Sequence, residues 1–106
     1  MIYHLPIPLA PPVLCICIDK NILKLNYNNG EELTFSCINM NDFMKGAITQ
    51  KQLETGSGGF KRLNIFSDTA ITNVAGKRTD RDIIVSDTDM DKIFNLVSIG
   101  TEVSVI

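Results

Sequence analysis

The sequence of 106 residues is long enough for one domain with one hydrophobic core, and its 44% hydrophobic content excludes a disordered chain. A formal net charge of −2 excludes a general attraction to nucleic acid or anionic membranes, and no apolar run approaches the roughly 20 residues that a membrane-spanning helix needs. Three cysteines, an odd number, without a secretory leader predict free thiols in a reducing compartment, so we expect a cytoplasmic protein.

Residues 1–12 hold all four prolines of the chain and are otherwise mostly apolar. Proline fixes φ and restrains the residue before it, so this segment is predicted to be an extended arm, separate from a single domain over residues 13–106. An apolar arm needs a surface to lie on. One hypothesis is that it contacts a protein partner or a second copy in a homo-oligomer, such as a dimer; the other is that it covers its own core. The predicted contact residues are Ile2, Tyr3, Leu5, Ile7 and Leu9.

Residues 13–37 are predicted to form three strands. Residues 13–18 are a continuous apolar run, whereas residues 22–27 and 32–37 alternate between apolar and polar side chains. A three-residue loop, 28–30, pairs Leu25 with Leu33 and Leu23 with Phe35, and it places Gly30 at the left-handed position of the turn. A two-residue loop would instead put apolar residues opposite polar ones.

The second half of the chain mixes helices and strands. One helix, or two short ones, is predicted over residues 41–54, followed by a glycine-rich loop at 56–59. Strands are predicted at 60–66, 69–74, 82–85 and 101–106, and a helix capped by Ser86 and Asp87 is predicted to bury Met90, Ile93, Phe94 and Val97 and to end at Gly100. The fold class is therefore expected to be α+β, with a small antiparallel sheet or open barrel of about six or seven strands and one or two short helices on one side.

Positive charge gathers in the middle of the chain. Residues 45–81 hold seven cations against three acids, whereas residues 82–106 hold one cation against five acids. If the strands at 60–66 and 69–74 form a hairpin, two basic pairs lie near one end of it, beside Phe60 and Phe66. The cations of this candidate site for single-stranded nucleic acid or a nucleotide are Lys61, Arg62, Lys77, Arg78 and Arg81. The alternative interpretation is a solvated basic turn.

Other motifs favour structural interpretations. The cysteines 15, 17 and 37 with His4 have the wrong spacing for a structural zinc site and are interpreted as buried, inert thiols. The acids at 87, 89 and 91 lack the glycine and glutamate of a calcium loop, so we interpret them as a helix N-terminus. The loop at 56–59 lacks the Gly-Lys-Ser/Thr ending of a phosphate-binding loop. We therefore predict no metal site, no cofactor and no catalytic residue.

The leading functional hypothesis is a non-catalytic protein-interaction module, a small subunit or accessory protein that binds itself or a larger partner. The alternatives are a nucleic-acid or nucleotide-binding protein and a small enzyme of unknown class. No membrane partner is expected. The richness in Ile and Asn and the absence of Trp are typical of AT-rich genomes, such as those of phages or mobile elements.

Overall fold

The computed structural model describes residues 11–40 and 43–106, and in these parts of the chain strands dominate. The first three strands are β1 (Val13–Cys17), β2 (Ile22–Asn26) and β3 (Glu32–Asn39). They are followed by the short β4 (Gly46–Ala47), β5 (Gln50–Glu54), β6 (Phe60–Phe66) and β7 (Thr69–Thr72). After a single 3₁₀ turn, η1 (Val74–Gly76), the chain forms β8 (Ile83–Val85), α1 (Asp87–Leu96) and β9 (Glu102–Val105).

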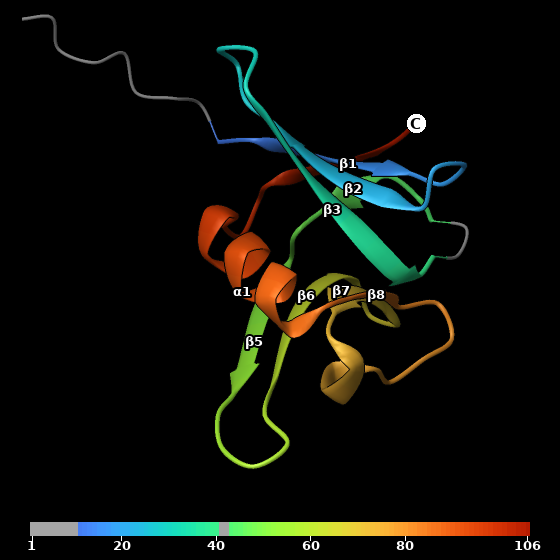
Figure 1. Ribbon diagram of the computed structural model, residues 1–106, viewed down its shortest axis with the longest axis vertical. Coiled ribbons are helices and arrows are strands. Elements are labelled where there is room, and N and C mark those ends of the chain that lie inside the picture. The colour runs from blue at the N-terminus through green and yellow to red at the C-terminus, as the bar shows by residue number, and fades with distance from the viewer. Residues whose placement is uncertain (1–10, 41–42) are drawn as a thin grey trace, which may run out of the picture.

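The nine strands form one continuous sheet in the order β4-β9-β1-β2-β3-β8-β7-β6-β5. The sheet is mixed, because β1 pairs with β9 and β7 pairs with β8 in parallel orientation. Figure 1 shows the sheet bent strongly on itself, with α1 alongside it. The prediction of six or seven antiparallel strands with one or two helices on one side is therefore wrong. Within the described residues there are more strands, two parallel pairings and a single α-helix.

The β2–β3 hairpin has the predicted register. Leu25 pairs with Leu33 and Leu23 with Phe35, and the Tyr27 N–H donates to the Glu31 carbonyl at 2.9 Å to close the loop at 28–30. Gly30 has a φ of 90°, the left-handed conformation that a turn of this kind requires. The alternation of side chains was therefore sufficient to set this local pairing.

The predicted helix over residues 41–54 is wrong. Gly46 and Ala47 pair with Val103 and Glu102 of β9, while residues 50–54 pair along their whole length with β6; residues 41 and 42 lie outside the described parts of the chain. Gly46 passes so close to β6 that a Cβ atom there would lie 2.9 Å from Cγ2 of Ile65. Hydrogen bonding to the distant strand β9 and to the following strand β6 outweighs the weak helical pattern of this segment.

The helix α1 begins as predicted and ends earlier than predicted. The Ser86 side chain accepts a hydrogen bond from the Asp89 N–H at 3.1 Å, which caps the first turn. The side chains of Met90 and Ile93 are fully buried, and Val97 and Phe94 also face the core. The helix ends at Leu96, four residues before Gly100. No helix in the described parts of the chain is long and apolar enough to cross a membrane.

Lys51 of β5 fixes the carboxyl end of α1. Its Nζ donates to the carbonyl oxygens of Phe94 at 2.5 Å and Val97 at 2.8 Å, and it lies 4.4 Å from the centre of the Phe94 ring. The last carbonyls of a helix have no partner inside the helix and carry partial negative charge, so a cation stabilises them. This contact sets the distance between α1 and the β5–β6 hairpin, and a cavity lies between these two elements.

Candidate functional site

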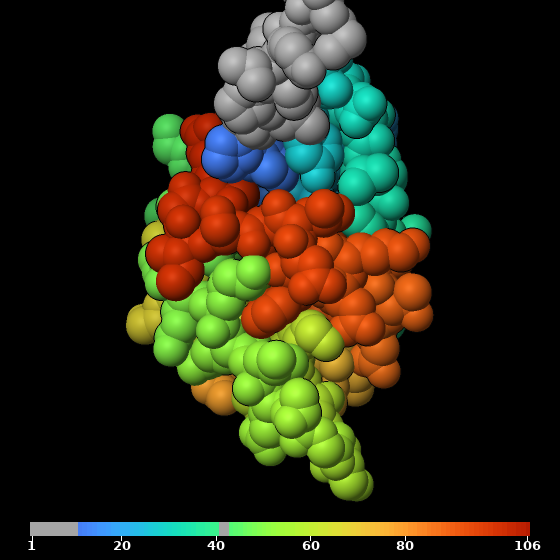
Figure 2. Space-filling view, turned by 90° about the vertical axis from the view of Figure 1, so that its left-hand side faces the viewer, coloured from blue at the N-terminus to red at the C-terminus, as the bar shows by residue number. Residues whose placement is uncertain are grey.

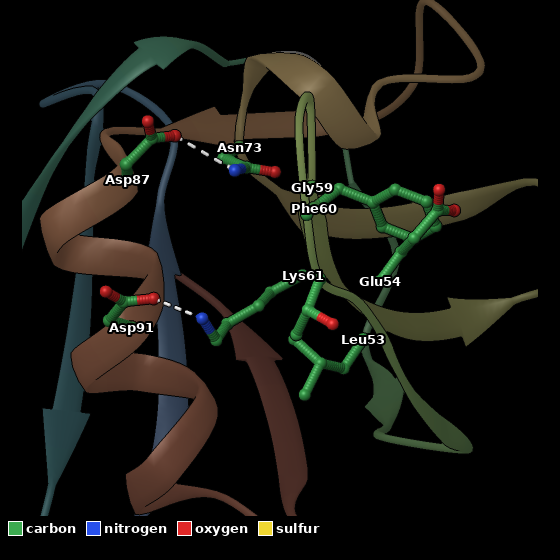
Figure 3. Close-up of a pocket in the computed structure, with 10 residues that line it drawn as sticks. Leu53, Glu54, Gly59, Phe60, Lys61, Asn73, Asp87 and Asp91 are labelled. Atoms are coloured by element: carbon green, nitrogen blue, oxygen red, sulfur yellow. Dashed lines mark hydrogen bonds and ion pairs between the residues drawn. The ribbon is translucent and has the colours of Figure 1, made fainter.

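A cavity of about 290 Å³ opens between the β5–β6 hairpin and the amino-terminal half of α1. Figure 3 shows Asp87 and Asp91 projecting from α1 towards Asn73 and Lys61 on the opposite wall. The residues that line the cavity are Leu53, Glu54, Thr55, Gly56, Gly59, Phe60, Lys61, Asn73, Asp87 and Asp91.

The glycine-rich loop forms the tip of the hairpin beside this cavity. Gly56 and Gly58 have φ angles of 113° and 80°, which residues with a Cβ atom rarely adopt. The Gly59 N–H donates to the Gly56 carbonyl at 2.9 Å and closes the turn. The hairpin projects from the body of the molecule (light green in Figure 2), so the cavity is reached from solvent. The loop that the sequence indicated as flexible thus shapes one wall of the site.

Two polar contacts join the walls of the cavity. The Asn73 side chain donates to the Asp87 carboxylate at 2.9 Å, and Lys61 forms an ion pair with Asp91. The cavity therefore contains three carboxylates, those of Glu54, Asp87 and Asp91, against one cation, Lys61. Because opposite charges attract, this excess of carboxylates favours a cationic ligand.

A buried ion pair holds the segment that carries Asn73. The Arg62 guanidinium donates to the Asp82 carboxylate at 2.5 Å and to the Gly76 carbonyl of η1 at 3.2 Å. The side chains are only 3% and 0% exposed. Asp82 also accepts from the backbone N–H groups of Ala70, Arg78 and Thr79. The network thus fixes β7, η1 and the loop before β8 relative to β6.

These contacts decide the charge state of Asp82. Burial alone would raise the pKa of its carboxyl, because a buried charge is poorly solvated. The hydrogen bond from Arg62, the backbone N–H groups of Arg78 and Thr79 and the positive charge of Arg62 act in the opposite direction and are stronger. The pKa of Asp82 is consequently lowered from its ordinary value, and the carboxylate is ionised at neutral pH.

The predicted basic cluster is only partly assembled, and most of its charges are paired. Arg62 is buried against Asp82, and Lys61 pairs with Asp91. The remaining pairs are Lys77 with Asp80 at 3.6 Å and Arg81 with Asp68 at 3.4 Å. Arg78 lies over the Phe60 ring, 5.3 Å from its centre. A ligand cannot reach Arg62, so the site does not have the composition that the nucleic-acid hypothesis required.

The other residues that the sequence analysis singled out are those of the arm and the three cysteines. The arm residues Ile2, Tyr3, Leu5, Ile7 and Leu9 lie outside the described residues. The three cysteines are free and buried, and none of them lines this cavity. Among residues 11–40 and 43–106 no group of three or more His, Cys, Asp or Glu side chains is placed to hold a metal ion.

The thiols also differ in their contacts. The Cys15 sulfur accepts hydrogen bonds from the Asn26 amide at 3.1 Å and the Ser104 hydroxyl at 3.2 Å. Burial raises the pKa of Cys37 to about 12, helped by the negative charges of Asp89 and Cys17. Since the thiolate is the reactive form, Cys37 is an inert thiol at neutral pH.

Sequence reasoning missed the cavity itself. Asp87 and Asp91 were interpreted only as acids at a helix N-terminus, and Asn73 and Glu54 were not singled out at all. The four residues come from α1, the position directly after β7 and the end of β5, so no local spacing connects them. The one available signal was the i, i+4 spacing of the two aspartates, which places them on one face of a helix.

Comparison with known proteins shows a fold used by enzymes. No family model matches the sequence, and neither does any curated protein. Two solved structures are similar over nearly the whole chain, each at 10% sequence identity. L,D-transpeptidase 1 of Mycobacterium tuberculosis matches with a TM-score of 0.68 over 91% of this chain, and the L,D-transpeptidase (Yku) of Stackebrandtia nassauensis matches with 0.70 over 92%. The chain spans 61% and 56% of the lengths of those two proteins.

These findings correct the leading functional hypothesis. The chain has the fold of two L,D-transpeptidase structures, so the prediction of a non-catalytic interaction module is not retained. At this level of identity the comparison establishes the fold alone. Burial takes Arg62 out of the nucleic-acid alternative, which otherwise stays a prediction.

Proposed function

We propose that this domain binds a peptide that carries a primary amine, with the ammonium group in the cavity between the β5–β6 hairpin and α1. A transpeptidase joins an acyl group to an amine, so an amine-bearing peptide is the acceptor that a domain of this fold would handle. The observation that carries the proposal is the excess of carboxylates in the cavity: Glu54, Asp87 and Asp91 against Lys61.

The charge balance favours an ammonium group over a carboxylate or phosphate. Lys61 is already paired with Asp91, so it offers little attraction to an anion. Asp87 accepts one hydrogen bond from Asn73, and a carboxylate has capacity for several more. Glu54 is exposed at the rim of the cavity. An ammonium group with three donors would be satisfied by this arrangement.

The neighbouring strand suggests how the rest of the peptide is held. β5 is the outermost strand at one end of the sheet, and its last two residues, Leu53 and Glu54, line the cavity. An extended peptide can add to such an edge through main-chain hydrogen bonds.

The proposal concerns recognition of the amine and assigns no residue to the acyl-transfer step. Acyl transfer needs a nucleophile within hydrogen-bonding reach of a base. No thiol and no histidine is among the residues that line the cavity. The chemistry supported by these residues is therefore electrostatic binding and orientation of the amine.

The test is a titration of the protein with the peptide Ala-Ala-Lys-Ala, blocked at both termini, followed by amide chemical shifts. We expect saturable shifts in α1 and in the β5–β6 hairpin. The same peptide with its lysine amine acetylated should bind at least about tenfold more weakly, because the acetylated amine carries no charge. Asp87→Asn and Glu54→Gln should weaken binding of the free-amine peptide.

Glu102→Gln is the matched control, since Glu102 is an exposed acid on β9 that does not line the cavity. It should leave binding unchanged. Equal binding of the free and acetylated peptides would refute amine recognition. Shifts confined to residues outside the cavity would place the peptide elsewhere and would refute the assigned site.

A further inference from the structure

A second and larger hollow lies beside the β2–β3 hairpin, whose two strands stand in the middle of the sheet order. This groove has a volume of about 620 Å³ and is lined by Tyr27, Glu31, Glu32, Leu33 and Leu96. It lies between the β2–β3 hairpin and the carboxyl end of α1. Leu33 and Leu96 are 42% and 39% exposed, so two large apolar side chains face solvent side by side on its wall. The groove shares no residue with the proposed amine site.

The chain enters the fold beside this groove. Val13, the first residue of β1, pairs with Asn26, and the next residue, Tyr27, lines the groove. Figure 1 shows the start of β1 lying near the end of β2 that leads into the β2–β3 loop. Pro12 is already buried, so the chain contacts the body of the domain before β1 begins. The described part of the chain therefore begins next to this apolar surface.

The residues that precede β1 have the composition and reach to fill it. Residues 1–12 contain no Asp, Glu, Lys or Arg and include Leu5, Ile7 and Leu9. At the polyproline rise of about 3.1 Å per residue, Leu9 can reach roughly 12 Å and Ile7 roughly 19 Å from Val13. Four prolines remove backbone donors, so the segment is poorly suited to add another strand and would dock through its side chains.

We propose that residues 5–9 of the same chain lie in this groove, with Ile7 and Leu9 packed on Leu33 and Leu96. The segment covers apolar surface that would otherwise face water, which is favourable in proportion to the area buried. It also joins the β2–β3 hairpin to the end of α1, two elements that lie far apart in the sequence. The proposal does not depend on the amine site.

A double-mutant cycle on the full chain tests the contact. Leu9→Ala and Leu96→Ala are made singly and together, and unfolding in urea is followed. If the side chains touch, the two changes are not additive, and the unfolding equilibrium constant of the double variant differs from the additive expectation by about threefold or more. The control cycle pairs Leu9→Ala with Val74→Ala, because Val74 is equally apolar, 65% exposed and outside the groove. The control cycle should be additive.

A second measurement locates the segment directly. A nitroxide attached to Ile2→Cys should broaden the methyl signals of Leu33 and Leu96 and spare those of Val74. The native cysteines are buried, and the unsubstituted protein carried through the same labelling corrects for any reaction at them. Additive energies in the Leu9–Leu96 cycle, or unbroadened Leu33 and Leu96 methyl groups, would overturn the proposal.

The same spin label distinguishes docking within one chain from docking between two copies of the chain. Spin-labelled protein without isotopes is mixed with isotope-labelled protein without a spin label. Broadening of Leu33 and Leu96 in that mixture, together with a doubled mass in solution, would assign the groove to the segment of a second copy and would overturn docking within one chain. Broadening only when both labels are in one chain is the expected result.

Discussion

Arg62 and Asp82 form a buried ion pair, with 2.5 Å between Nη1 and Oδ2, at the junction of β6 with the loop that precedes β8. The two residues are twenty positions apart in the sequence. Through Gly76 and the backbone of Arg78 and Thr79, the pair fixes the segment that begins at Asn73. Asn73 in turn contacts Asp87 in the cavity, so the ion pair links the interior of the sheet to the proposed site.

We expect Asp82→Ala to destabilise the protein by about 3–5 kcal/mol, because the change leaves a buried guanidinium and three backbone N–H groups without an acceptor. Urea unfolding followed by circular dichroism measures the change. The control is Asp68→Asn, which removes one partner of an ion pair whose side chains are more than half exposed and should cost no more than about 1 kcal/mol. A cost for Asp82→Ala as small as that of the control would contradict the role of the buried pair.

The lowered pKa of Asp82 predicts a loss of stability in acid. The folded state favours the ionised carboxyl, so its contribution is fully present above the ordinary carboxyl pKa of about 4 and disappears as the pH falls through the lower value in the folded protein. The free energy of unfolding should therefore fall more steeply below pH 4 in the natural protein than in Asp82→Asn. Urea unfolding at a series of pH values checks this difference. Parallel curves for the two proteins would argue against it.

The contact between Lys51 and the carboxyl end of α1 leads to a prediction about the stability of this helix. Lys51→Met keeps an unbranched side chain but removes two charged hydrogen bonds to the carbonyls of Phe94 and Val97, so we expect a loss of about 1–3 kcal/mol. Hydrogen exchange should accelerate most in the last turn of α1 and around the start of β5. The matched control is Lys20→Met, at an exposed lysine in the turn after β1, which should leave both stability and exchange almost unchanged.

The sequence predicted those parts of the fold that depend on neighbouring residues. The register of Leu25 with Leu33 and the Ser86 cap both rest on contacts within about ten positions, and both are confirmed. The parallel pairing of β1 with β9 joins Cys15 to Ser104, 89 positions away, and leaves no local pattern. Residues 46 and 47 were misassigned for the same reason, because they pair with the distant strand β9, whereas residues 50–54 pair with the next strand, β6, in a hairpin that the helical pattern of the segment obscured.

The candidate site was harder to predict for the same reason. Asn73 and Glu54 belong to a site only because β5, α1 and the residue after β7 meet around one cavity. The sequence shows clearly that basic residues gather in the middle of the chain. It does not show which acids pair with them. Arg62, which looks like half of an exposed basic pair, is buried because the alternation of β6 turns it towards Asp82. Charge counted along the chain thus did not reveal which charges face solvent.

The raised pKa of Cys37 predicts sensitivity to alkali. The folded state favours the protonated thiol, so its contribution is fully present below the ordinary thiol pKa of 9.0 and is lost as the pH rises from there towards about 12. Over that range the free energy of unfolding should fall by up to about 1.4 kcal/mol per pH unit more in the natural protein than in Cys37→Ala. The difference between the two proteins isolates this thiol from the lysines and tyrosines that titrate over the same range. Urea unfolding between pH 7 and pH 11 measures it, and identical slopes for the two proteins would show that Cys37 ionises as readily in the folded chain as in the unfolded one.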